Sequence, residues 1–238
     1  MCWVVLNRGA DGRTLGVLMM ISLNWLNTYL DRAIDVDEAD EILTAVGFPL
    51  DGREAHGEDW LLDVEVTSNR PDCLSHWGVA REIAAATGRE ARLLDVAEIT
   101  DEPMDPDAHA ADAIDRITSV THDEAAWSDC PHYTAAVIRN VTVAASPPWL
   151  VERIEAIGLR PVNNIVDITN FILHELGQPL HAFDLDRLAE RRIVVRHARA
   201  DEPFKAIDGS SHQLRSDMLV IADAEKPAAV AGVMGGID

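Results

Sequence analysis

Apolar residues recur at helical spacing in several stretches that are bounded by polar or turn-forming residues. The predicted helices cover residues 22–30, 36–46, 75–87, 147–157 and 163–176. The helix at 36–46 is the best marked. Asp35 can cap its start, Glu38 stands at the reciprocal capping position, and Gly47 can end it.

Shorter apolar or alternating runs predict strands between these helices. They lie at 60–66, 133–138, 193–196 and 218–222, and the closing AVAGVMGG is a further apolar strand that runs into a glycine turn. The polar segment 52–59 is predicted as a loop, and Asp208–Gly209 as a turn. Short strands mixed with helices, without regular βαβ alternation, predict the α+β fold class.

The composition changes over residues 96–130, which are acidic, rich in Asp and Pro and poor in large apolar groups. This pattern predicts an acidic linker or solvated edge between a domain at 20–95 and another at 131–238. Residues 1–19 lack the continuous apolar stretch and small-residue cleavage site of a signal peptide. They are predicted to be a leader or a misassigned start, because Met20 begins a segment with better local patterning.

The 238 residues are 47% hydrophobic, which is enough to bury a core. The formal net charge of −21 argues against holding nucleic acid by bulk electrostatics. Three scattered cysteines are too few for a disulfide framework or a structural zinc site, which favours a reducing cytoplasm. No run is long and apolar enough to predict a membrane span.

The most informative stretch is the predicted helix at 163–176. Polar residues at 163, 167, 170 and 174 form a stripe separate from the apolar one. A solvent-facing stripe is one interpretation. Two amides, an aspartate and a histidine without lysine or arginine, however, favour a partly buried hydrogen-bonding surface.

His181 follows this helix at the end of an extended turn stiffened by Pro179. A lone histidine is more often structural than catalytic, since it usually finds a backbone partner. The glycines of 231–236 permit a close approach of backbone to ligand, or equally a tight turn between strands. No nucleophile elbow, zinc-protease, Walker or dinucleotide motif is present, so the residues alone predict a polar pocket around Asn170 and His181 and name no reaction.

Several separated segments resemble bacterial phenylalanyl-tRNA synthetase β subunits, in the order of that family. They are ISLNWLNTYLD at 21–31, EVTSNRPDCLSHWGVAREIAAATG at 65–88, RIEAIGLRPVNNIVDITNFILHELGQPLHAFDLDRL at 153–188, AIDG at 206–209 and AGVMGG at 231–236. The resemblance implies a small N-terminal α+β domain followed by an incomplete mixed α/β editing domain.

The resemblance also implies an activity, which is the hydrolysis of tyrosine wrongly attached to the phenylalanine tRNA. A pocket for phenylalanine excludes an analogue with one added hydroxyl only weakly, so a second hydrolytic site is needed. The family's motifs match Thr169, Asn170 and His181 as catalytic residues, and Ala231 and Gly232 as substrate-binding residues. The first two would hydrogen-bond the aminoacyl ester or terminal adenosine. His181 would orient that adenosine or the attacking water.

This sequence departs from the family in two respects. A pocket glutamate expected downstream of AGVMGG is not reached before Asp238, which predicts a fragment or truncated product with weak or no editing by itself. The tRNA-binding OB-fold insertion usual after the second helix is also missing, and only residues 51–59 fill that space. The acidic charge is easier to reconcile with tRNA once this module is absent.

For the holoenzyme, the resemblance implies a cytoplasmic ligase of two α and two β subunits that attaches phenylalanine to its tRNA with ATP and magnesium. It places the ATP and phenylalanine sites on the α subunit and the magnesium groups beyond this chain, so no cofactor or metal ligand is predicted here. No membrane partner is predicted. Two alternatives remain at this point, a free-standing tRNA-editing protein and a non-catalytic scaffold that binds the α subunit.

Overall fold

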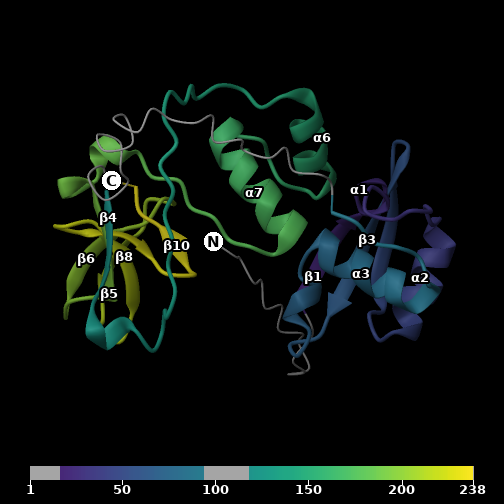
Figure 1. Ribbon diagram of the computed structural model, residues 1–238, viewed down its shortest axis with the longest axis horizontal. Helices are drawn as coiled ribbons and strands as arrows, with labels where there is room; N and C mark the ends of the chain where they lie inside the picture. The colour runs from purple at the N-terminus through teal and green to yellow at the C-terminus, as the bar shows by residue number, and fades with distance from the viewer. Residues whose placement is uncertain (1–16, 94–117, 238) are drawn as a thin grey trace, which may run out of the picture. The chain divides into compact units, whose positions relative to one another are not determined.

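The computed structural model describes residues 17–93 and 118–237. The chain divides into two compact units (Figure 1). Of the described residues, the N-terminal unit holds 17–93 and Val143–Ala182, and the C-terminal unit holds 118–142 and 183–237. The predicted contiguous domain at 131–238 is therefore divided, because its helical part groups with the N-terminal unit.

A three-stranded antiparallel sheet begins the N-terminal unit, with β1 (Val17–Ser22), β3 (Asp59–Val66) and β2 (Leu50–His56) in the order β1-β3-β2. The predicted strand at 60–66 is confirmed. The predicted loop at 52–59 is wrong over most of its length. Segment β2 is an edge strand with exposed side chains, so its polar sequence hides the ladder that pairs it with β3.

The predicted leader at 1–19 also needs correction at its end. Residues 17–19 lie in β1, and Met19 is buried in the core of the unit. Residues 1–16 lie outside the described part of the chain.

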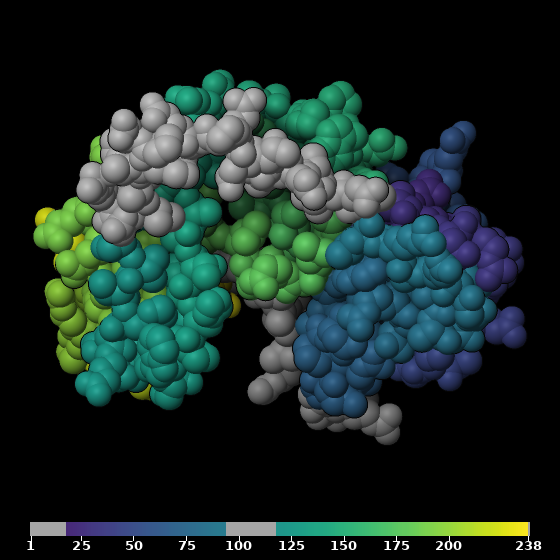
Figure 2. Space-filling model, in the orientation of Figure 1, coloured from purple at the N-terminus to yellow at the C-terminus, as the bar shows by residue number. Residues whose placement is uncertain are grey.

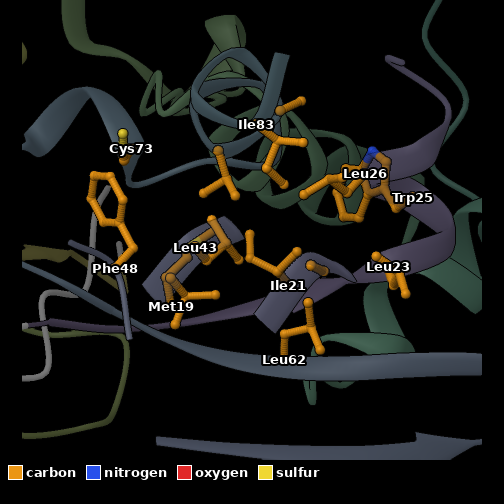
Figure 3. Packing of buried hydrophobic residues seen from close by; sticks show 14 of the residues in the cluster. Met19, Ile21, Leu23, Trp25, Leu26, Leu43, Phe48, Leu62, Cys73 and Ile83 are labelled. Atoms are coloured by element: carbon orange, nitrogen blue, oxygen red, sulfur yellow. The ribbon is translucent and has the colours of Figure 1, made fainter. Parts of the chain in front are cut away.

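Three helices cover this sheet, namely α1 (Leu23–Asn27), α2 (Val36–Ala45) and α3 (His76–Thr87). Apolar side chains from strands and helices meet in one core (Figure 3). Ile21 and Leu62 from the sheet lie in that core with Leu26, Leu43 and Ile83 from the helices, and all five are fully buried. Burial of this apolar surface is the main force that holds the unit together.

Local capping chemistry sets the helix ends. The Asp35 carboxylate accepts from the Glu38 N–H, and Ser75 Oγ accepts from the Gly78 N–H, at the starts of α2 and α3. Helix α3 ends at Gly88, which has a left-handed conformation. The predicted reciprocal role of Glu38 is wrong, since its carboxylate instead pairs with Arg89 at 2.7 Å.

The last part of the N-terminal unit is a helix pair, α6 (Pro148–Ala156) and α7 (Asn164–Leu176). Both helices confirm predictions made from sequence. Gly158 follows α6 with φ of +78° and Gly177 follows α7 with φ of +76°, so each glycine ends a helix in the left-handed region.

A five-stranded sheet forms the C-terminal unit in the order β10-β9-β8-β5-β4. Its strands are β4 (Ser119–His122), β5 (Arg192–His197), β8 (Leu219–Ala222), β9 (Pro227–Val230) and β10 (Met234–Gly235). Only the β4–β5 pair is parallel. A hairpin of β6 (Glu202–Lys205) and β7 (Ser211–Leu214) adds a small second sheet, with the predicted Asp208–Gly209 turn at its tip.

Two sequence-based expectations fail in this unit. Part of the predicted acidic linker, Ser119–His122, is strand β4, while residues 94–117 of that region lie outside the described part of the chain. Residues 133–138 alternate in burial but form no strand. Alternation reports the direction of side chains, whereas a strand also needs a neighbouring ladder, and none is present there among the described residues.

Short 3-10 segments at Pro71–Cys73, Glu124–Ala126, Leu185–Arg187 and Ala189–Arg191 complete the secondary structure. Helices packed on an antiparallel sheet in the N-terminal unit, and a second, mostly antiparallel sheet in the C-terminal unit, confirm the α+β class. Within residues 17–93 and 118–237, no helix has the length and apolar character that crossing a lipid bilayer requires.

Candidate functional site on helix α7 and the following turn

Helix α7 carries the polar stripe predicted from sequence, and its start is fixed by that stripe. The Asn163 side chain accepts from the N–H groups of Ile165 and Val166, both at 3.0 Å. These bonds satisfy two of the backbone donors that a helix leaves free at its first turn.

Asp167 is the most deeply placed polar residue of the stripe. It is fully buried, and its carboxylate accepts from Ser146 Oγ at 2.5 Å and from the Val162 N–H at 2.9 Å. The prediction of a partly buried hydrogen-bonding surface is thereby confirmed at this position. Asp167 ties the approach to α6 and the α6–α7 loop to helix α7.

The apolar stripe of α7 is only partly covered. Leu173 is buried, but Val166, Ile168 and Leu176 are exposed large hydrophobic residues. Atoms of α7 are visible in green on the face drawn in Figure 2. The better-buried side of α7 is thus the one that carries Asp167 and Leu173, and the side with Val166, Ile168 and Leu176 is more exposed.

Thr169 and Asn170 lie side by side in sequence on α7, and both are half-buried. Thr169 Oγ1 donates to the Val166 carbonyl at 2.7 Å, which uses its one hydroxyl hydrogen. The lone pairs of that oxygen are then left to accept. The Asn170 amide makes no hydrogen bond to any residue that the structure describes, so it keeps both a donor and an acceptor for a ligand.

His181 follows in the extended segment after Gly177 and belongs to the same unit as Thr169 and Asn170. Its side chain reaches the surface. Desolvation by the surrounding protein lowers the pKa of the imidazole below its ordinary value, which favours the neutral ring at pH 7. A neutral ring has one nitrogen that can accept a proton or a hydrogen bond.

Ala231 and Gly232 lie in the C-terminal unit, in the turn between β9 and β10. Gly232 has φ of +68°, and a Cβ added to it would meet open space. Its glycine requirement therefore comes from the backbone conformation rather than from crowding. The structure thus brings three of the five predicted residues into one unit and the other two into the second.

Contacts with α1 and α3 hold α7 in the N-terminal unit. The ring of Trp25 stacks between His76, at 3.9 Å between centroids, and Phe171 of α7, at 4.9 Å. Tyr29 Oη donates to the Glu175 carboxylate at 2.7 Å. These contacts explain why the helix pair groups with a sheet far from it in sequence.

His76 is the most constrained of these side chains. It is fully buried; Nε2 accepts from the Ser22 N–H at 3.1 Å, so Nδ1 carries the hydrogen that it donates to the His174 carbonyl at 2.9 Å. Burial lowers the pKa of His76 to about 3. No role for His76 was predicted from sequence, because no local signal announces its partners, which are 54 and 98 residues away.

Among the described residues, one group of possible metal ligands comes together, formed by Asp72, Cys73 and Glu82. The Arg70 guanidinium already occupies its centre, with contacts of 2.8 Å to Asp72, 3.3 Å to Cys73 and 2.5 Å to Glu82. Burial raises the pKa of the Cys73 thiol to about 12. A neutral thiol and a resident cation are both unfavourable for a metal.

Comparisons with known proteins agree with the family resemblance. A model of the B3/4 domain matches residues 129–238. The phenylalanine–tRNA ligase β subunit of Rhodopirellula baltica is 43% identical over 218 residues, which cover 92% of this chain and 30% of that protein. That of Salinibacter ruber is 49% identical over 197 residues, which cover 81% and 22%.

A solved structure, an N-terminal fragment of the phenylalanyl-tRNA synthetase β subunit from Pyrococcus horikoshii, matches 92% of this chain and 62% of its own at 14% identity and a TM-score of 0.47. The chain spans less than a third of the length of the β subunits named above. By sequence, the chain is therefore a member of the phenylalanyl-tRNA synthetase β-subunit family, homologous to its N-terminal region and including the B3/4 domain match.

Proposed function

We propose that this chain supplies one side of a hydrolytic editing site for mischarged tyrosyl-tRNA, as part of a phenylalanine–tRNA ligase. The single observation that carries the proposal is the half-buried Asn170 amide without a described partner, on a helix inside the B3/4 match. An unpaired polar group in such a place costs free energy unless a ligand or water satisfies it.

The residues of α7 have distinct parts in this proposal. Asn170 can donate and accept, which suits the ester carbonyl and a ribose hydroxyl of the terminal adenosine. Thr169 can only accept, because its hydrogen is committed to Val166. It therefore suits a donor on the substrate, such as the tyrosine ammonium group or a ribose hydroxyl.

His181 orients the attacking water in this proposal. Its lowered pKa keeps the ring neutral at pH 7, so that one nitrogen can accept a hydrogen bond from the water. The water oxygen forms a bond to the ester carbonyl carbon while the bond from that carbon to the ribose oxygen breaks. The ribose oxygen leaves with a proton, and the products are tyrosine and free tRNA.

Ala231 and Gly232 form the wall of the amino-acid pocket in this proposal. Small side chains leave room for the tyrosine ring, and the open space at Gly232 is consistent with that role. Cys73 is a poor candidate for a covalent intermediate, because its buried thiol stays protonated at pH 7. Positioning of water accounts for the chemistry without an activated nucleophile.

The whole ligase activity is part of the same proposal. Attachment of phenylalanine with ATP and magnesium is assigned to a cytoplasmic complex of two α and two β subunits, with the reactive site outside this chain. Copurification of the chain with an α subunit tests this partnership directly.

The editing role is tested by deacylation of tyrosyl-tRNA. The assay uses the full chain and the chain extended beyond Asp238 with the corresponding sequence of the Rhodopirellula baltica relative. We expect hydrolysis by the extended protein and little by the chain alone. Asn170→Ala and His181→Ala should each slow hydrolysis by the extended protein at least about tenfold, a loss typical of one positioned group.

Asn69→Ala and His56→Ala are the matched controls, since both residues are exposed and lie away from α7 in sequence. They should leave the rate unchanged. Unaltered rates in both Asn170→Ala and His181→Ala would remove these residues from the mechanism and the proposal with them.

A further inference from the structure

On helix α6, an exposed aromatic side chain lies beside a cation that has no ion pair among the described residues. Trp149 is 52% exposed, and its ring meets Phe171 of α7 edge to face, with 5.5 Å between centroids and 86° between planes. Arg153 is four residues further along α6, on the same side of the helix. Its guanidinium carbon lies 5.6 Å from the Phe171 centroid and 5.2 Å from that of Trp25.

The Arg153 guanidinium lies against aromatic rings and not, among the described residues, against a carboxylate. No acidic side chain among the described residues lies within ion-pair distance of it, although the chain has 41 acidic residues. Glu152 and Glu155 are its neighbours in sequence, but residues one and two apart on a helix point to different sides. Arg153 is half-buried and keeps N–H donors available to an anion.

An exposed aromatic face beside a guanidinium is the combination that binds an unpaired nucleotide. Bases stack on aromatic side chains, and the phosphate takes hydrogen bonds from arginine. The net charge of −21 repels any extended polyanion, which favours a ligand held by one stacked base and one phosphate contact over a broad anionic surface. If Trp149 served only to pack against Phe171, about half of its surface would remain in water. Arg153 would then have no anion among the described residues.

We propose that Trp149 and Arg153 form a docking site for one unpaired nucleotide of a single-stranded RNA, with the base on the Trp149 ring and its phosphate at Arg153. The inference rests on the proposed function for the source of the RNA, which would be the unpaired 3′ end of the tRNA. Phe171 directly follows Asn170 in α7, so a single helix supports both the nucleotide site and the editing residues.

The test is a binding titration of the full chain with a fluorescein-labelled single-stranded hexaribonucleotide, followed by anisotropy at low salt. Trp149→Ala should weaken binding about fivefold or more, the loss expected for one stacked base. Trp149→Phe should retain most of the affinity, because it keeps an aromatic face. Trp127→Ala is the matched control: Trp127 is 55% exposed, meets His122 edge to face and belongs to the C-terminal unit.

The contribution of Arg153 is measured separately, from the dependence of RNA affinity on salt concentration. A single phosphate contact contributes about −0.7 to the slope of log affinity against log salt on a single strand. Arg153→Gln should therefore make the slope less negative by about 0.7, and Arg153→Lys should restore it. Circular dichroism of each variant shows whether the fold is kept.

Three results would overturn the site. They are no binding by the wild-type chain, equal affinities for Trp149→Ala and wild type with both folded, and equal losses for Trp149→Ala and Trp127→Ala. A failure of the editing proposal can be distinguished from a failure of the nucleotide site. Hydrolysis that ignores Asn170→Ala and His181→Ala, together with RNA binding that needs Trp149, would refute editing and leave the nucleotide site in place.

Discussion

Mild acid should destabilise the N-terminal unit, because of His76. Its pKa is about 3 in the folded chain and about 6.5 in an unfolded one. The unfolded state therefore binds more protons between these values. The stabilisation is fully present above pH 6.5 and falls as the pH drops towards 3. From pH 7 to pH 5, we expect the free energy of unfolding to fall by about 2 kcal/mol, at about 1.4 kcal/mol per pH unit below 6.5.

The geometry of His76 explains the size of this effect. Both ring nitrogens are engaged, Nε2 as acceptor from the Ser22 N–H and Nδ1 as donor to the His174 carbonyl. A proton added at Nε2 would face an N–H donor in a fully buried site. The pKa values of His174 and His181 are also lowered by desolvation, so they change stability in the same direction.

Urea unfolding at pH 7, 6 and 5, followed by tryptophan fluorescence, measures the effect. His76→Gln keeps a donor and an acceptor but cannot be protonated, so its stability should depend less on pH whatever its absolute value. His56→Ala, at an exposed position, should keep the wild-type slope. Nuclear magnetic resonance of the wild-type ring needs no variant, and a His76 signal that titrates near pH 6.5 would refute the reasoning.

Three further changes test the packing by urea unfolding. Gly78→Ala should cost at least about 3 kcal/mol or prevent folding, because the added Cβ would lie 1.9 Å from the Asp72 carbonyl oxygen, and an unchanged midpoint would contradict this close approach. Asp167→Ala should cost about 1–3 kcal/mol, because Ser146 Oγ and the Val162 N–H lose the buried carboxylate that accepts from them, and a neutral result would mean that water replaces the carboxylate. Glu202→Ala should cost about 3–5 kcal/mol, because it removes the partner of the Arg196 guanidinium, whose side chain is only 11% exposed and is bonded to Glu202 at 2.7 and 2.8 Å. An unchanged midpoint would show that water replaces the carboxylate.

Sequence was a good guide wherever the physical signal is local. Helix starts at Asp35, Ser75 and Asn163 follow from side chains that satisfy backbone donors two or three residues away, and the structure has all three. Helix ends follow from glycine in the same way, as at Gly177. Caps of this kind depend on no distant partner, so a single sequence contains the information.

Strands were harder because their partners are remote. Residues 51–56 are exposed and mostly polar, yet they belong to a strand that pairs with β3. Residues 133–138 alternate, but they form no ladder with any described residue. Alternation and polarity report which side of the backbone meets water. They do not report whether another strand lies alongside.

The candidate site could likewise be predicted from sequence only in part. The polar stripe of α7 predicted a buried hydrogen-bonding surface, and Asp167 occupies it. The choice of Thr169, Asn170 and His181 came from the family resemblance, since residue type alone named no reaction. Neither the exposure of Trp149 nor the lack of a partner for Asn170 among the described residues could be predicted from sequence, because each depends on how other segments of the chain are placed.

The long connection between His76 and His174 sets an order of events during synthesis. Ninety-eight residues separate donor and acceptor, so at about 5–20 residues per second the ribosome needs about 5–20 s to make the second after the first. During that interval the nascent sheet and its first three helices lack the segment that stacks on Trp25. Docking of α7 is thus the closing step for this unit, and a ribosome stalled before it would hold a chain whose aromatic cluster still faces solvent and chaperones.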